Sequence, residues 1–143
     1  MQITRREEYG LRGLVFLAKQ PPDKVSLVSE VSREENIPET FLAKIFQRLS
    51  KAGVLWSFRG ANGGFKLRKP AHEITMKEII EALEGPIVLN RCLLNKGECK
   101  AEKDCSLRPV WEEVQQRFLE ILNSTTMEDL VNRSTRDGKK RRR

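Results

Sequence analysis

The chain has 143 residues, of which 38% are apolar and 33% are charged, and it contains three cysteines and one histidine. This length fits one compact domain with short appendages. No apolar run approaches the roughly 20 residues that a membrane span needs, and the first residues contain no apolar signal-peptide core. We therefore expect a protein of the reducing cytoplasm that has no membrane partner.

The net charge of +7 is concentrated at the C-terminus. Residues 133–143 carry seven Lys or Arg and one Asp, a net of +6, which leaves +1 for residues 1–132. A like-charged end of this kind is typically disordered and adds non-specific attraction to a polyanion. We expect residues 133–143 to form a basic, disordered tail, and a solvated tail without function is the alternative.

Apolar periodicity predicts three helices in the first third of the chain. Between Thr4 and Lys19 apolar residues recur at helical spacing, and Thr4 is a suitable N-cap. A second, short helix fits residues 26–35, and a third fits Pro38 to Ala52, with Gly53 as its C-terminal stop. Two short helices joined by a tight turn, the second strongly amphipathic, predict a helix-turn-helix.

Two predicted strands follow, over residues 54–58 and 65–67, and a glycine-rich segment separates them. A helix-turn-helix followed by such a hairpin is a winged helix. Further helices are predicted over residues 74–83 and 110–122, and the apolar stripe of the latter is long enough to pack against a second copy. We expect a mainly α fold with a small β-hairpin wing: a DNA-binding domain over 1–86, a loop over 87–106 that contains all three cysteines, and a dimerisation helix with a short C-terminal helix over 107–132.

The third helix and the wing carry the residue types that contact DNA. A recognition helix reads base edges from its N-terminal end, while basic residues further along it lie nearer phosphates. In the wing, glycines permit close approach to a backbone, and an arginine can enter a minor groove. An ordinary solvated helix face and a flexible hairpin are the alternatives. The candidate DNA-binding residues are Thr40, Phe41, Ala43, Lys44, Arg48, Arg59 and Gly60.

The three cysteines, Cys92, Cys99 and Cys105, lie close together on a polar stretch with the spacing C-x6-C-x5-C. Their odd number and the expected compartment argue against disulfides. Zinc sites usually contain C-x2-C pairs, which are absent, whereas the thiolates of an iron–sulfur cluster must reach more than one iron. The spacing therefore favours an iron–sulfur cluster, which makes residues 87–106 a cluster-binding loop. The alternatives are a zinc-stabilised interaction module, an iron–sulfur redox protein without specific DNA binding, and three unrelated surface cysteines.

Several stretches of residues 1–132 match a known family. They are Ile3-Thr4, Tyr9-Gly10-Leu11-Arg12, Phe41-Leu42, Ile45-Phe46-Gln47-Arg48-Leu49, Arg59-Gly60, Gly63-Gly64-Phe65, the three cysteines and Trp111. In these stretches the chain resembles the bacterial iron–sulfur winged-helix transcription regulators, the family of the iron–sulfur cluster biogenesis regulator IscR and the nitric oxide sensor NsrR.

The resemblance, which is greatest to IscR, implies a homodimer that binds palindromic double-stranded promoter DNA. It implies that Cys92, Cys99 and Cys105 are cluster ligands, and it favours [2Fe-2S] over [4Fe-4S]. We therefore expect a transcription regulator that senses iron–sulfur cluster status and controls promoters of cluster biogenesis genes. A nitric oxide or redox-sensing repressor of the same family is the alternative. The sequence contains no catalytic constellation, so we expect no enzyme activity.

Two positions depart from the IscR pattern. Ala43 replaces a glutamate, which changes the expected operator preference. Arg108 stands where a histidine ligand is expected, and arginine cannot ligate iron. The resemblance to NsrR implies that Glu8 of the partner subunit supplies the fourth ligand. His72, the only histidine, is the other protein ligand considered.

Overall fold

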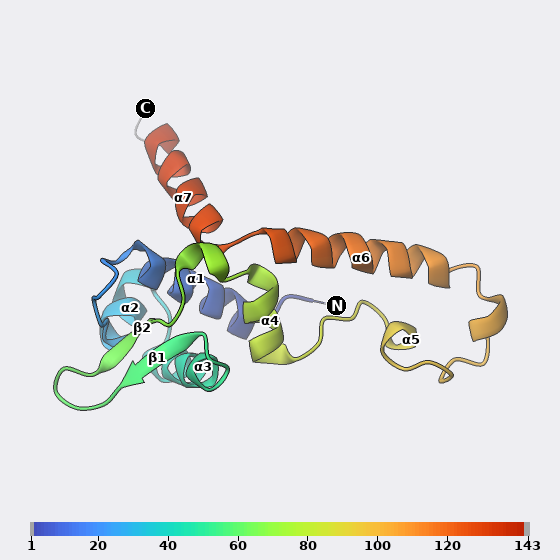
Figure 1. Ribbon diagram of the computed structural model, residues 1–143, viewed down its shortest axis with the longest axis horizontal. Coiled ribbons are helices and arrows are strands. Elements are labelled where there is room, and N and C mark those ends of the chain that lie inside the picture. Colours follow the sequence, from blue (N-terminus) through green and yellow to red (C-terminus); the bar gives the residue numbers. More distant parts are fainter. Residues whose placement is uncertain (1, 142–143) are drawn as a thin grey trace.

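The computed structural model describes the backbone of residues 2–141 and the side chains of residues 2–137 (Figure 1). Three helices, α1 (Arg5–Lys19), α2 (Val28–Glu35) and α3 (Glu39–Lys51), precede an antiparallel hairpin of β1 (Leu55–Phe58) and β2 (Gly64–Leu67). This arrangement confirms the predicted winged helix-turn-helix.

Helix α1 begins at a capping box. The Glu7 N–H donates to Thr4 Oγ1 over 3.3 Å, and the Thr4 N–H donates to the Glu7 carboxylate over 2.6 Å. The predicted N-cap is therefore confirmed, and the otherwise costly burial of Glu7 is accounted for by this reciprocal bond. Two buried glycines let other helices approach α1 closely. A Cβ on Gly13 would lie 2.8 Å from the ring of Phe46 in α3.

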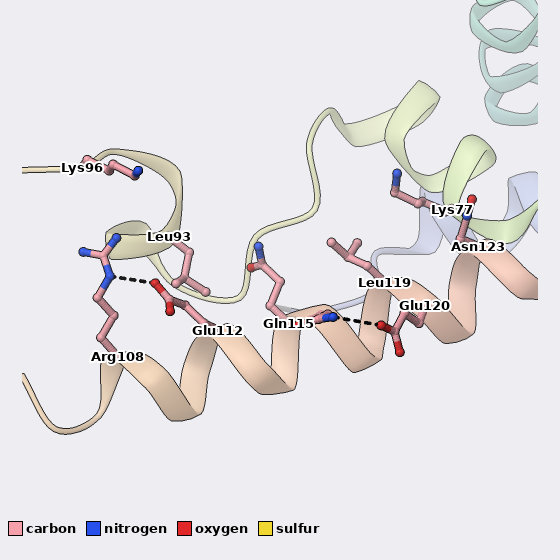
Figure 2. A pocket seen from close by; sticks show the side chains of 10 residues that line it. Lys77, Leu93, Lys96, Arg108, Glu112, Gln115, Leu119, Glu120 and Asn123 are labelled. Carbon is pink, nitrogen blue, oxygen red and sulfur yellow. Dashed lines mark hydrogen bonds and ion pairs between the residues drawn. The ribbon is translucent and has the colours of Figure 1, made fainter.

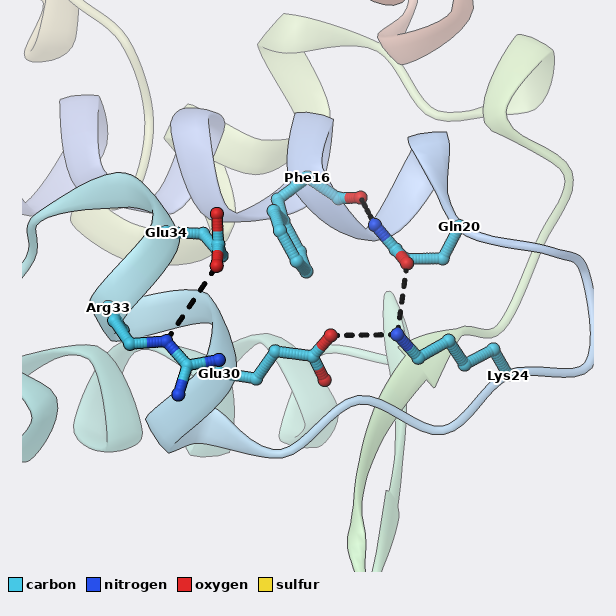
Figure 3. A network of polar contacts seen from close by, with 6 residues as sticks. All are labelled: Phe16, Gln20, Lys24, Glu30, Arg33 and Glu34. Atoms are coloured by element: carbon cyan, nitrogen blue, oxygen red, sulfur yellow. Dashed lines mark hydrogen bonds and ion pairs between the residues drawn. The ribbon is translucent and has the colours of Figure 1, made fainter.

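Helix α3 buries the predicted stripe of Leu42, Ile45, Phe46 and Leu49. Ahead of it, polar contacts hold the segment between α1 and α2 in place (Figure 3). Lys24 Nζ lies 2.7 Å from the Glu30 carboxylate and 3.2 Å from Gln20 Oε1, and the Gln20 amide donates to the Phe16 carbonyl over 3.2 Å. These contacts tie the start of α2 to the end of α1.

The hairpin is joined to the helical core through β2. Leu55 pairs with Leu67 and Phe58 pairs with Gly64. Ser26 adds a bridge to β2, because its N–H and carbonyl bond with Phe65 over 2.9 and 2.8 Å. A Cβ on Gly64 would lie 2.3 Å from the Ser26 carbonyl oxygen, so only glycine fits there.

The second half of the chain contains α4 (Met76–Glu84), α5 (Arg91–Leu94), α6 (Arg108–Ser124) and α7 (Met127–Arg141), with short 3-10 turns at Ala71–Glu73 and Glu102–Asp104. Figure 1 shows α6 running away from the winged helix, with the cysteine segment at its far end, opposite the wing. Only the C-terminal part of α6 joins the body, where Leu122 packs with Ile80 and Ile87. Among the described residues, no helix is long and apolar enough to cross a membrane.

Residues 133–141, for which the composition predicts a disordered tail, continue α7 from Met127 in the structure. Helix α7 starts at a reciprocal pair, because the Thr126 N–H donates to the Asp129 carboxylate over 2.9 Å and the Asp129 N–H donates to Thr126 Oγ1 over 3.2 Å. Hydrogen bonding to the Asp129 carboxylate, first from the Thr126 N–H and then from the Thr126 side chain, lowers the pKa of Asp129. Once a helix is nucleated, each further residue adds a hydrogen bond, and Arg and Lys are good helix formers. Residues 142 and 143 lie outside the described residues.

Candidate functional site

The outer face of α3 presents Thr40, Lys44 and Arg48, all exposed, opposite the buried stripe. Two other candidates are less accessible. Ala43 is half-buried, and the half-buried ring of Phe41 packs edge-on against Tyr9 of α1, with 5.7 Å between ring centroids. Phe41 therefore helps to fasten α3 to α1 and leaves only part of its ring for a ligand.

The wing exposes both predicted residues, Arg59 and Gly60, and Gly60 has a positive φ of 98° that suits glycine. The outward face of the hairpin also carries two aromatic rings, each beside a cation. The Arg68 guanidinium lies 4.2 Å from the Trp56 ring centroid, and the Lys66 ammonium lies 5.6 Å from that of Phe58.

The sequence between Glu39 and Glu73 contains seven Lys or Arg and no acidic residue. One of these cations, Lys69, pairs with Glu78. The others have no acidic partner within the described part of the chain, whereas cations of α1 and α4 form pairs such as Arg6–Glu84 and Lys77–Glu81. The unpaired cations of α3 and the wing are Lys44, Lys51, Arg48, Arg59, Lys66 and Arg68. Such a surface attracts a polyanion. The absence of acidic residues from this stretch can be read from the sequence. It would have identified Lys66 and Arg68 as further candidate DNA contacts.

The three cysteines are unpaired thiols that line one cavity of about 390 Å³. Cys92 and Cys105 are half-buried and Cys99 is exposed. Within the described residues, no three Cys, His, Asp or Glu side chains gather closely enough to hold a single metal ion. The cavity is lined by Asn90, Arg91, Cys92, Glu98, Cys99, Glu102, Cys105, Leu107, Arg108 and Trp111.

Arg108, the first residue of α6, forms two ion pairs, one with the cysteine segment and one within the helix. Its guanidinium pairs with Glu102, which lies between the second and third cysteines, and its Nε lies 2.9 Å from the Glu112 carboxylate on the next turn of α6 (Figure 2). Glu102 also accepts a hydrogen bond from the Gly97 N–H. Hydrogen bonding to Glu112, followed by that to Glu102, raises the pKa of Arg108 above its usual value.

The two candidates for a fourth ligand do not line this cavity in one chain. Glu8 is exposed on the first turn of α1. His72 is exposed beside Glu73 and Glu128, at the end of the wing. Neither side chain joins the cysteines within one chain, and the predicted role of Glu8 requires a second copy.

An apolar stripe runs along the outer face of α6. Val110, Val114 and Ile121 recur at helical spacing with 54%, 44% and 64% of their surface exposed, and Trp111 lies beside them. A stripe this exposed has no partner among the residues that the structure describes, which is typical of an interaction face.

A helix-turn-helix with a glycine-tipped wing, both carrying unpaired cations, defines a winged-helix transcription regulator. The chain belongs to the Rrf2 family of iron-dependent transcriptional regulators, which matches residues 3–133. Members of this family are transcription regulators that bind DNA and are typically dimeric, so this protein is not an enzyme.

Solved structures agree with this assignment. The chain is 30% identical to CymR (YrzC), the global cysteine regulator of B. subtilis, with a TM-score of 0.78 over 92% of this chain and 97% of that one. It is 30% identical to the oxidized form of Staphylococcus aureus CymR, with a TM-score of 0.70 over 92% and 96%. T. potens IscR is 24% identical, with a TM-score of 0.74 over 94% and 88%, and this likeness shows the fold alone. The predicted fold and family are therefore confirmed, and IscR-like specificity stays a prediction.

Proposed function

We propose that this protein is a homodimeric, cytoplasmic transcription regulator that binds palindromic promoter DNA and senses iron–sulfur cluster status through Cys92, Cys99 and Cys105. The observation that carries the proposal is the convergence of all three cysteines of the chain on one cavity as free thiols. We infer promoters of cluster biogenesis genes as its targets, from the resemblance to IscR.

The thiols fit a cluster better than a single ion. They line one cavity without approaching single-ion geometry, and a cluster needs thiolates that reach different irons. The three cysteines would hold the cluster, which we infer to be [2Fe-2S] rather than [4Fe-4S]. When bound, it would supply a redox-active and oxygen-sensitive centre. Arg108 cannot ligate, since a guanidinium offers no free lone pair.

DNA binding is assigned to α3 and the wing. Thr40 and Lys44 would read base edges in the major groove, with Ala43 and the exposed part of Phe41 beside thymine methyls. Arg48 would contact phosphate. Arg59 and Gly60 would follow the adjacent minor groove. The absence of acids between Glu39 and Glu73 supports this assignment, because no carboxylate there repels phosphate.

We assign dimerisation to the exposed apolar stripe of α6. Pairing of this helix with its copy would cover Val110, Val114 and Ile121. It would also bring a second first helix near each cavity, so that the partner's Glu8 supplies the fourth ligand. A carboxylate is a harder and more exchangeable ligand than a thiolate, which suits a sensor.

The body of the protein offers a route from the cysteines to the DNA-binding face. Helix α6 packs on α4 through Leu122 and Ile80, and the Met76 N–H donates to the Thr125 carbonyl over 2.9 Å. Leu83 of α4 approaches Gly10 of α1 so closely that a Cβ there would lie 2.6 Å away. A shift of α6 would therefore displace α4 and α1, the helices that pack against α3.

The test is anaerobic purification followed by absorption and Mössbauer spectra, then measurement of DNA binding with and without the cluster. Operator DNA would be obtained by selection from random sequences. We expect a coloured protein whose operator affinity depends on the cluster. A colourless protein containing zinc would indicate a zinc-stabilised module, and a cluster protein without sequence preference would indicate a redox protein.

A cluster-free thiol regulator is the second candidate. It is favoured by the three free thiols on one cavity and by 30% identity to the cysteine regulator CymR. In this case the cysteines would respond directly to oxidants, or to nitric oxide, as a redox-sensing repressor does. Operator binding that changes on thiol oxidation, in protein that never takes up iron, would favour it.

Replacing Arg59 by alanine should weaken binding to the selected operator by roughly 1 to 3 kcal/mol, because a groove contact of the wing is lost. Fluorescence anisotropy at fixed salt measures the change. Lys19→Ala, an exposed cation at the end of α1, is the control and should bind normally. Unchanged affinity in folded Arg59→Ala protein would count against the wing contact.

Replacing Glu8 by alanine should alter the spectrum and shorten the lifetime of the cluster while leaving the fold intact. A first-turn acid contributes only about 0.3 to 1 kcal/mol to a helix, so unfolding is not expected. Glu8→Cys should give a more persistent cluster, since thiolate binds iron more strongly. Glu34→Ala, at an exposed acid of α2, is the control. An unaltered spectrum and lifetime in Glu8→Ala would remove the carboxylate from the ligand set.

A further inference from the structure

The segment that carries the cysteines lacks a core of its own. No residue between Ile87 and Leu122 is buried, so little apolar packing holds residues 88–107 against α6. Ahead of the cysteines, the Leu89 N–H donates to Gln115 of α6 over 2.9 Å. Apart from that contact, side-chain interactions within the segment and with the start of α6 determine its position.

Arg108 is the centre of these interactions. With only 16% of its side chain exposed, it lines both the cysteine cavity and the groove of about 460 Å³ between α4, α5 and α6 (Figure 2). Glu102 is the matching carboxylate on the segment. One of its oxygens pairs with Arg108, and the other accepts from the Gly97 N–H.

The resulting chain of contacts crosses the segment twice. It runs from Gly97, between the first and second cysteines, through Glu102, between the second and third, to Arg108 and Glu112 on α6. A guanidinium is suited to this place because its forked donors engage two carboxylates at once. A single contact would fix one point, whereas this chain fixes the relative positions of both halves of the segment.

We infer that Arg108 is a positioning residue at the start of α6: it fastens the cysteine segment to this helix through Glu102, while Glu112 of the same helix holds its guanidinium in place. It keeps the three thiols on one cavity before any cofactor binds, and it makes a displacement of the segment act on the long helix. The regulatory consequence rests on the proposed function, but the fastening itself is a property of the metal-free protein.

The fastening is tested on full-length, reduced, metal-free protein by timed alkylation with iodoacetamide, resolved by cysteine, and by hydrogen exchange of residues 91–107. Arg108→Ala should speed alkylation of Cys92 and Cys105 by about fivefold or more, the lower end of what a small loss of local stability produces. Cys99 is already exposed and should change little. Peptides of the wing should exchange as in the wild type, which shows that the fold is intact.

Arg117→Ala is the matched control. It removes the Arg117–Glu113 pair of 2.8 Å on the same helix, but the Arg117 side chain is 74% exposed and this pair lies within α6, not with the cysteine segment. We expect wild-type rates from it. Glu102→Gln should reproduce most of the Arg108→Ala effect, and Arg108→Lys should restore part of the protection, because Lys keeps the charge without the forked donors.

Wild-type alkylation and exchange rates in Arg108→Ala, or equal acceleration in Arg117→Ala, would overturn the inference. The outcome is separate from the proposed function. If the wild-type protein never takes up iron, the labelling still reports on the fastening. If the cluster binds and labelling is unaffected by Arg108→Ala, the fastening alone fails.

Discussion

Replacing Phe46 by alanine should destabilise the protein by about 3 to 5 kcal/mol, a large part of the roughly 5 to 15 kcal/mol that holds a domain together. Phe46 is fully buried, and its ring meets Phe65 of β2 edge-on with 5.2 Å between centroids. It also fills the space opposite Gly13 of α1. One side chain thus joins α1, α3 and the wing, and its loss leaves a cavity where all three meet.

Urea denaturation followed by circular dichroism measures this effect. Phe58→Ala is the matched control, because the Phe58 ring lies on the outer face of the wing with 41% of its surface exposed. It should change the free energy of unfolding by less than about 1 kcal/mol. A similarly small loss of unfolding free energy for Phe46→Ala would mean that Phe46 does not join α1, α3 and the wing.

The winged helix was predictable because the sequence signals that specify its helices and strands are local. The buried stripe of α3 repeats at helical spacing, Thr4 caps α1, and Gly53, with a φ of 81°, ends the third helix as expected. Each of these signals acts within a few residues, where periodicity and capping rules are strongest. The strands were placed to within one residue for the same reason.

The cysteine segment was less predictable because its structure depends on pairings between separate stretches. The family resemblance and the chemistry of arginine showed that Arg108 could not be a ligand, but they did not show which carboxylates it would pair with. Glu102 lies six residues before it and Glu112 four residues after it, and only the start of α6 brings them together. The short helix α5 is too brief to leave a periodic pattern.

The C-terminal segment shows the limit of an inference from composition. Its composition predicts disorder, but composition takes no account of the residues that precede it, and α7 extends to Arg141. Leu130 packs against the main core and Met127 is fully buried, so tertiary contacts nucleate α7 and the basic residues continue it. Figure 1 shows α7 leaving the body on the side away from the wing. The charge of residues 133–137 is therefore displayed far from the recognition helix of the same chain.

Replacing Cys105 by serine should nearly abolish the visible absorption of the reconstituted protein, which is the largest effect expected for the cluster site. A serine hydroxyl stays protonated near neutral pH and is a poor ligand for iron, so two thiolates would remain where three are proposed. Since the chain has no cysteine besides the three, no other thiol can substitute. Operator affinity should then equal that of metal-free wild-type protein.

Ser106→Ala, a change of similar size at the exposed neighbouring position, is the control and should leave absorption and iron content unchanged. Iron and sulfide analysis separates loss of the cluster from a shift of its spectrum. Full cluster content in each of Cys92→Ser, Cys99→Ser and Cys105→Ser would exclude the thiols as ligands. Loss of iron in all three, with wild-type circular dichroism, would place every thiol in the ligand set, because removal of any one ligand then leaves too few thiolates to retain the cluster.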